Sequence, residues 1–167
     1  MRTGTLTVAA AAVLVMAGST GGIAQASTLT HGGGYRGPAS SSAPASTATV
    51  KAAKSKVGTI LVDGQGRTLY LFEKDKGGKS ACSGECAAVW PPLITSGKPT
   101  AGAGVNASWL STTQRPDGKT QVTYHNWPLY YYAGDSKAGD MTGQDINGFG
   151  AKWYVVGAAT GGKMEMG

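Results

Sequence analysis

Short stretches of alternating hydrophobic and polar residues run along the second half of this chain, separated by Gly, Asn and Asp. Residues 59–62 and 68–72 are β-branched, apolar or aromatic, and they flank the sequence Asp-Gly-Gln-Gly at 63–66. Two such runs on either side of a turn are typical of a β-hairpin. No long helical periodicity is found between residues 57 and 160, so the pattern predicts a mainly β domain.

A second hairpin of the same outline is expected about sixty residues later. Residues 121–124 form its first expected strand, 125–128 the connection and 129–132 the return strand. Residues 109–113 precede it across a Pro-Asp-Gly turn, so this half predicts a three-stranded meander. Residues 80–89 are rich in small side chains and are followed by two prolines, which predicts one short helical turn near the cysteines.

The two hairpins carry the same motif. Residues 69–75 read LYLFEKD and residues 129–135 read LYYYAGD, so both are Leu-Tyr-x-aromatic-x-x-Asp. Self-similarity of this kind indicates a supersecondary unit used twice. Each copy also ends in a tryptophan, Trp90 in the first and Trp153 in the second. We therefore predict a small single domain made of two tandem hairpin or meander repeats.

The shared motif has a structural interpretation. Residues two apart in a strand face the same way, so the two aromatics of each copy share a face. The Asp lies beyond the strand end, where its carboxylate can accept backbone N–H groups and close a turn. We interpret the aromatics as core and the carboxylates as loop closures, although a groove-lining role stays open. The motif residues are Tyr70, Phe72, Asp75, Tyr130, Tyr132 and Asp135.

The N-terminal residues predict export. A basic start is followed by an apolar run at 6–16 and by Ala-Gln-Ala at 24–26, which suits cleavage before Ser27. The apolar run is shorter than the roughly 20 residues that span a membrane. We expect residues 1–26 to be a signal peptide and the mature protein to be secreted, with no transmembrane segment.

Composition divides the remainder of the chain. Residues 27–56 are mostly Ser, Ala, Thr, Gly and Pro, which predicts a disordered linker. Residues 57–160 form the expected repeat domain, and residues 161–167 the expected flexible tail. Within the domain, the copies are expected at about residues 57–97 and 105–157.

The net charge of +6 lies mostly outside the expected domain. Between residues 57 and 160 there are nine Lys and Arg against eight Asp and Glu. No basic stripe is present there, which argues against a nucleic-acid partner. Attraction to an acidic cell-wall polymer or membrane surface would act through the linker residues Lys51, Lys54 and Lys56.

The chain resembles a known bacterial family. The paired Tyr-x-aromatic-x-x-Asp motifs, the segment CSGECAAVWPPL at 82–93 and the segment GAKWYVV at 150–156 are similar to the "secreted repeat of unknown function", whose members are described as predicted lipoproteins with a Yx(FWY)xxD motif. The resemblance implies duplicated β-rich repeats in exported or surface-attached proteins, with no established activity. This chain lacks a cysteine at the expected cleavage site, which favours a freely secreted form.

Cys82 and Cys86 are the only two cysteines. An even pair in an exported protein predicts a disulfide, which would stabilise so small a loop by about 2 kcal/mol. A redox-active pair and a thiolate metal site are the alternatives. The soft donors of this chain suit copper, so copper binding or electron transfer is the second functional hypothesis. Its candidate ligands are Cys82, Cys86, His125, Met164 and Met166.

Catalytic chemistry has little support in the sequence. No serine lies in a Gly-x-Ser-x-Gly elbow, and the acidic loop at 135–147 contains only a fragment of a calcium-binding pattern. A secreted hydrolase is therefore the weakest alternative. The leading hypothesis is a non-catalytic exported binding or structural module of the cell envelope or extracellular space, with no cofactor expected.

Overall fold

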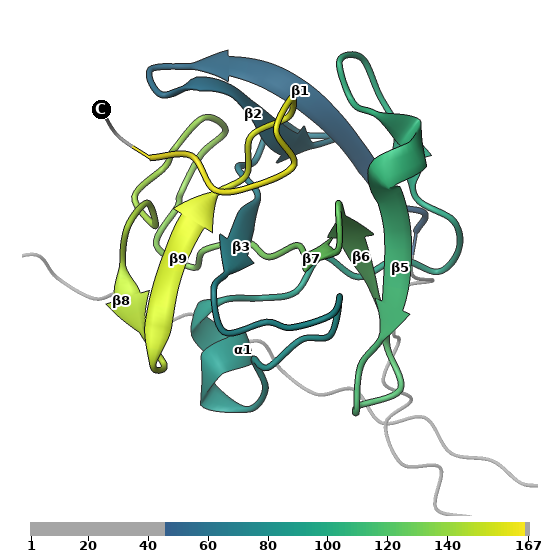
Figure 1. The fold of residues 1–167 in the computed structure, drawn as a ribbon, viewed down its shortest axis with the longest axis vertical. Coiled ribbons are helices and arrows are strands. Elements are labelled where there is room, and N and C mark those ends of the chain that lie inside the picture. Colours follow the sequence, from purple (N-terminus) through teal and green to yellow (C-terminus); the bar gives the residue numbers. More distant parts are fainter. Residues whose placement is uncertain (1–45, 166–167) are drawn as a thin grey trace, which may run out of the picture. The chain divides into compact units, whose positions relative to one another are not determined.

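The computed structural model describes residues 46–165 of the chain. The expected signal peptide, residues 27–45 of the expected linker, and Met166 lie outside the described residues. The described part contains three small sheets, one α-helix and one 3-10 turn (Figure 1). The mainly β fold of two repeats, with a helical turn at the cysteines, is confirmed.

The first sheet has the strand order β2-β1-β4. β1 (Thr49–Ser55) pairs antiparallel with β2 (Gly58–Asp63) from Val50 onward, and β4 (Thr100–Ala101) adds a short parallel strand at the start of β1. The domain therefore begins earlier than expected, because β1 lies within the segment 27–56 that the composition assigned to a linker. Val50 is fully buried and anchors this small-residue strand to the core.

The second sheet has the order β3-β9-β8. β3 (Tyr70–Phe72) pairs antiparallel with β9 (Ala151–Val155), and β8 (Asn147–Gly148) precedes β9 across a tight turn. The expected hairpin from residue 59 to 72 forms only next to its turn, where the Asp63 N–H donates to the Arg67 carbonyl at 2.9 Å and the Leu69 N–H donates to the Leu61 carbonyl at 3.0 Å. Beyond that point the chain leaves β2 to pair with the other copy.

The third sheet is the expected meander, but its return strand lies at 127–128 and not at the expected 129–132. β5 (Leu110–Gln114), β6 (Thr120–Tyr124) and β7 (Trp127–Pro128) are consecutive antiparallel strands. The 3-10 turn η1 (Ala107–Trp109) leads into β5. The connection before β7 is shorter than expected: two residues, His125 and Asn126, take φ of 47° and 66°. Such a pair of positive φ values matches the twist of a two-residue hairpin.

The chain after β9 is more ordered than expected. Val156 forms a bridge with Lys163, and the Met164 N–H donates to the Val155 carbonyl at 2.9 Å. The Gln144 side chain also donates to the Met164 carbonyl at 2.6 Å. The segment 161–165 thus belongs to the fold rather than to a flexible tail.

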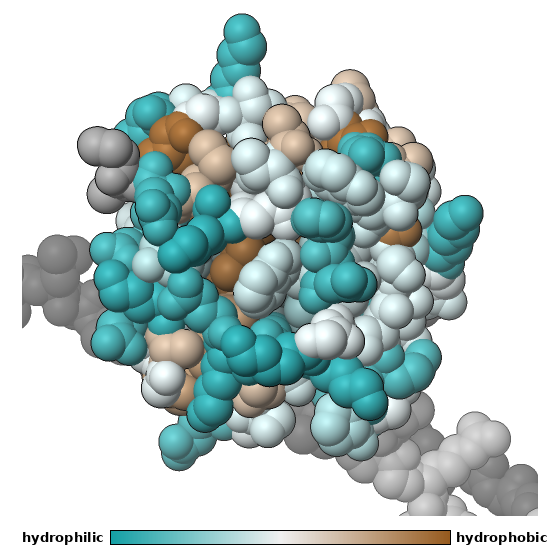
Figure 2. All heavy atoms as spheres, viewed as in Figure 1, coloured by the Kyte–Doolittle hydropathy of each residue, from teal (hydrophilic) through white to brown (hydrophobic). Residues whose placement is uncertain are grey.

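The core divides into two clusters of buried side chains. One is mainly aliphatic and lies among β1, β2, β5 and β6; its leucine and valine members include Val50, Leu61, Leu69, Leu71, Leu93, Val122, Leu129 and Val156. The other is aromatic and contains both motif copies. On the face seen in Figure 2, hydrophobic atoms show only as small separate patches among polar side chains. No helix within residues 46–165 has the length and apolarity to span a bilayer.

Candidate functional site

The two motif copies exchange hydrogen bonds between their tyrosines and aspartates. The Tyr70 hydroxyl donates to Asp135 Oδ2 at 2.6 Å, and the Tyr130 hydroxyl donates to Asp75 Oδ2 at 2.7 Å. The backbones of Tyr70 and Tyr130 also exchange N–H···O bonds of 2.9 and 3.0 Å. Each tyrosine therefore bonds the carboxylate of the other copy, and the copies are related by an approximate two-fold relation at this pair.

Each motif carboxylate also holds its own loop. Asp75 Oδ1 accepts the Ala81 N–H at 2.7 Å. Asp135 Oδ1 accepts the Thr142 N–H at 2.9 Å and the Thr142 hydroxyl at 2.6 Å. Both carboxylates thus close a six- or seven-residue loop after the strand end and, at the same time, bind the opposite copy.

Four aromatic rings, two from each copy, lie in one continuous row, in which three rings are buried and the fourth, Tyr132, is half-buried and tilted by 33°. The Trp90 and Trp153 rings are parallel within 2° at a centroid distance of 4.0 Å. Phe72 stacks on the other face of this pair, 4.0 Å from Trp153, and Tyr132 lies 4.4 Å from Trp90. Each tryptophan therefore contacts the second aromatic of the motif in the opposite copy.

The motif tyrosines pack against the edges of this stack. Tyr70 meets Trp90 at 5.4 Å and Tyr130 meets Trp153 at 5.1 Å, both in edge-to-face geometry. Edge-to-face pairs of this kind add about 0.5–1.5 kcal/mol each beyond the buried area. Tyr70 and Tyr130 are fully buried, so they do not form a surface groove.

Burial sets the protonation of the exchanged pairs. It raises the pKa of Asp75 to about 6, against the lowering effect of the Ala81 N–H, the Tyr130 hydroxyl and Arg115. Burial also raises the pKa of Tyr70 and of Tyr130, and the facing carboxylates add to this. Both phenols therefore stay protonated and remain donors.

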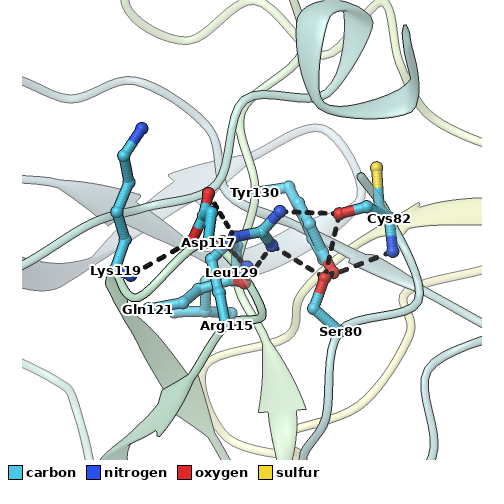
Figure 3. Close-up of polar contacts among 8 residues, drawn as sticks. All are labelled: Ser80, Cys82, Arg115, Asp117, Lys119, Gln121, Leu129 and Tyr130. Atoms are coloured by element: carbon cyan, nitrogen blue, oxygen red, sulfur yellow. Dashed lines mark hydrogen bonds and ion pairs between the residues drawn. The ribbon is translucent and has the colours of Figure 1, made fainter. Parts of the chain in front are cut away.

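A buried arginine of the second copy reaches the cysteine loop of the first (Figure 3). Arg115, which is 5% exposed, donates from Nη1 to Gln121 Oε1 at 2.7 Å and to Ser80 Oγ at 2.8 Å. Its Nη2 donates to the Cys82 carbonyl at 2.7 Å. Ser80 Oγ lies 2.7 Å from the Tyr130 hydroxyl, so the arginine joins the exchanged motif through one serine.

No sequence pattern indicates this role of Arg115. It precedes Pro-Asp-Gly and reads as a solvated residue of a turn. Its Nε has no hydrogen-bond partner among the described residues and lies 3.6 Å from Asp117 Oδ2, which is a loose ion pair. The guanidinium is thus held mainly by its two terminal nitrogens.

Cys82 and Cys86 form the expected disulfide, with their Cα atoms 5.3 Å apart. Cys86 lies in α1 (Glu85–Val89), and both cysteines are buried against the aromatic cluster. The bridge fixes the segment whose Cys82 carbonyl accepts from Arg115. As long as it is formed, neither sulfur is a thiolate.

The other copper candidates lie in separate contacts. His125 is exposed and stacks on Trp109 at 4.5 Å, whereas Met164 packs against the aromatic cluster. Between residues 46 and 165, no three side chains of His, Cys, Asp or Glu gather in a metal-binding group. The structure therefore does not bring His125 and the cysteines together as a ligand set.

A cavity of about 530 Å³ lies between the β1–β2 turn and residues 139–142 of the second copy. We call it the hairpin cavity. Its walls include the apolar side chains of Ile60, Val62 and Met141, and two lysines stand among its lining residues. The full lining is Ala53, Lys54, Ser55, Lys56, Ile60, Val62, Gly66, Gly139, Asp140, Met141 and Thr142.

The hairpin cavity occupies the position that Arg115 fills in the other copy. Ile60 pairs with Ala53 across β1–β2 as Gln121 pairs with Thr113 across β5–β6. The residues that follow agree, since Leu61 donates to the Val156 carbonyl and Val122 to the Leu93 carbonyl. The polar Gln121 that binds Arg115 is therefore replaced by Ile60 in the first copy.

The loop on the opposite side of the hairpin cavity also has an apolar residue where the other copy has a polar one. Met141 precedes Thr142, the residue bonded to Asp135, just as Ser80 precedes Ala81, the residue bonded to Asp75. The Ser80 hydroxyl, which accepts a hydrogen bond from Arg115, is thus replaced by the thioether of Met141 in the other copy. The first-copy position is open and apolar, while the second-copy position is filled and polar.

A further hollow of about 370 Å³ is lined by Asp63, Arg67 and Tyr131 among others. Its charged groups already bind one another. Arg67 Nε lies 3.0 Å from Asp63 Oδ2, the Tyr131 hydroxyl donates to the same oxygen at 3.0 Å, and the guanidinium covers the Tyr131 ring at 3.9 Å. These contacts leave less free polar capacity there than at the hairpin cavity.

Comparison with known proteins adds the family. No curated protein and no solved structure matched the chain. The family model described as "Secreted repeat of unknown function" matches twice, at residues 51–94 and 111–157. These two matches coincide with the two copies that exchange their Tyr–Asp pairs and together cover more than half of the sequence. The chain therefore belongs to the family of secreted repeats of unknown function.

Proposed function

We propose that this chain is an exported, non-catalytic binding module that takes a small ligand into the hairpin cavity. The observation that carries the proposal is the difference between two equivalent positions. Arg115 fills one of them, whereas the other is a cavity of about 530 Å³. That volume falls in the range of about 300–1,000 Å³ usual for small-molecule sites.

The motif residues support a structural rather than a catalytic role. Each motif carboxylate is bonded to a phenol of the other copy and to an amide of its own loop. The aromatic rings are packed on one another in the core. A rigid frame of this kind suits a module whose variable part is the hairpin and loop at its periphery.

The experiment is a fluorescence titration of the full chain with N-phenyl-1-naphthylamine, an uncharged apolar probe. We expect saturable binding of one probe per chain. Ala53→Phe should abolish it by filling the cavity, and Met141→Trp, from the opposite wall, should do the same. Thr112→Phe is the matched control, because Thr112 is exposed on β5. Binding that survives both cavity substitutions, in variants that unfold cooperatively, would contradict the proposal.

A further inference from the structure

We infer that the ligand of the hairpin cavity is an amphipathic anion, with an apolar body and a single anionic group. The inference rests on the proposed function and adds the chemical class of the ligand. Three features carry it: the apolar walls, the two lysines at the β1–β2 turn, and the neutralised carboxylate on the opposite side.

The walls accept an apolar body. Ile60 and Val62 are buried, and Met141 is half-buried against the aromatic cluster. An unbranched thioether adapts to ligands of different outline. These three side chains, with Ala53, provide the apolar part of the lining.

The lysines supply the charge. Lys54 lies near the end of β1 and Lys56 in the turn that follows, and both are exposed lining residues of the cavity. Neither ammonium is hydrogen-bonded or ion-paired with another residue between 46 and 165. By contrast, Lys51 of the same strand donates to the Gly64 carbonyl at 2.8 Å. Two unengaged ammonium groups beside an apolar hollow favour an anionic head group.

Asp140 is the one carboxylate among the lining residues, and its negative charge is balanced by neighbouring residues of its own loop. Its Oδ1 lies 3.0 Å from Lys137 Nζ, and its Oδ2 accepts the N–H groups of Ser136 and Lys137 at 3.0 and 3.1 Å. The bond from Lys137 lowers the pKa of Asp140 to about 2, so at neutral pH the carboxylate is ionised and paired with the Lys137 ammonium. It therefore offsets little of the positive potential from Lys54 and Lys56.

Two probes that differ only in a sulfonate test the inference: N-phenyl-1-naphthylamine and 8-anilinonaphthalene-1-sulfonate. We expect the full chain to bind the sulfonate probe about tenfold more tightly than the uncharged probe. A gain of this size is what a few exposed or half-exposed charge contacts provide. Lys54→Gln with Lys56→Gln should remove this advantage and leave the uncharged probe unaffected. Added salt should weaken the binding of the sulfonate probe but not that of the uncharged probe.

The matched control is Lys76→Gln with Lys79→Gln, two exposed lysines outside the cavity. This pair should change neither affinity. Equal binding of both probes, unaffected by Lys54 and Lys56, would overturn the anionic inference and leave the proposed binding function standing. Failure of both probes to bind the folded chain would overturn the proposed function as well. Thermal unfolding of each variant verifies that it is folded.

Discussion

The Tyr130 hydroxyl donates a 2.7 Å hydrogen bond to a carboxylate oxygen of Asp75, a residue 55 positions earlier in the other copy of the repeat. Its counterpart joins Tyr70 to Asp135 across 65 positions. The motif thus specifies a contact between copies as well as a turn within each copy. A single copy has its tyrosine and its aspartate but lacks the partner of both.

Removing one phenol should cost more in one copy than in the other. Tyr130→Phe leaves Oδ2 of Asp75, a residue that is 2% exposed, without its phenol donor, and only the Ala81 N–H on Oδ1 remains, so we expect a loss of about 2 kcal/mol in the free energy of unfolding. Tyr70→Phe should cost about 1 kcal/mol, because Asp135 is half-exposed and keeps both donors of Thr142. Chemical denaturation at about pH 7.5 measures both. Equal losses would contradict the assigned difference in burial.

Stability should fall as pH rises past the raised pKa of Asp75. Burial puts that pKa at about 6 in the folded protein, against about 3.9 when unfolded. The folded state therefore binds the proton more tightly, and this stabilisation is complete below about pH 4 and is lost as pH rises through about 6. The difference between the folded and the unfolded pKa sets an upper limit of about 3 kcal/mol on the unfolding free energy that is lost over this pH range.

Asp75→Asn isolates this contribution. Asparagine keeps an oxygen for the loop amide but does not titrate, so we expect its unfolding free energy to lack the decline between about pH 4 and pH 7. Denaturation curves for both proteins across that interval provide the comparison. A decline of the same size in the variant would assign the pH dependence to another group.

Neither copy should fold alone. The stack alternates between copies, since Trp153 lies between Phe72 and Trp90. A fragment ending near residue 103, or one starting there, exposes half of this stack to water. We expect each fragment to lack near-ultraviolet dichroism and the mixture of the two to regain it. A folded spectrum from one fragment by itself would contradict the interlocked core.

Local features of the fold were predictable from sequence for physical reasons. The meander is specified by its alternating strands and Pro-Asp-Gly turn, and the disulfide by two cysteines in an exported chain. β1 escaped prediction because its Ala, Lys and Ser residues have weak strand preference, and its pairing with β2 and β4 supplies what local propensity lacks.

The exchange of the motif could not be read from one copy. The pattern of a strand shows that Tyr70 and Phe72 share a face, but not whose carboxylate that face meets. Arg115 is the clearest omission, because a cation before a turn is usually solvated. The cavity follows from contacts far apart in the sequence, because Ile60 and Met141 stand where Gln121 and Ser80 bind Arg115.

The last prediction concerns the arginine and the disulfide together. Arg115→Lys cannot serve three acceptors with the same planar fork, so buried acceptors on Gln121 and Cys82 lose their donor. We expect a loss of about 3 kcal/mol. Replacing both cysteines by serine should cost about 2 kcal/mol through the unfolded state. Arg67→Lys, at a half-exposed ion pair, is the control and should cost less than about 1 kcal/mol.

Combining the two changes tests whether the bridge holds the acceptor in place for the guanidinium. If it does, the triple variant loses less stability than the two losses added, because the Cys82 carbonyl is no longer fixed when the arginine is replaced. A double-mutant cycle from denaturation curves gives this coupling, which we expect to reach about 1 kcal/mol. Strict additivity would mean that the disulfide and Arg115 stabilise the cysteine loop independently.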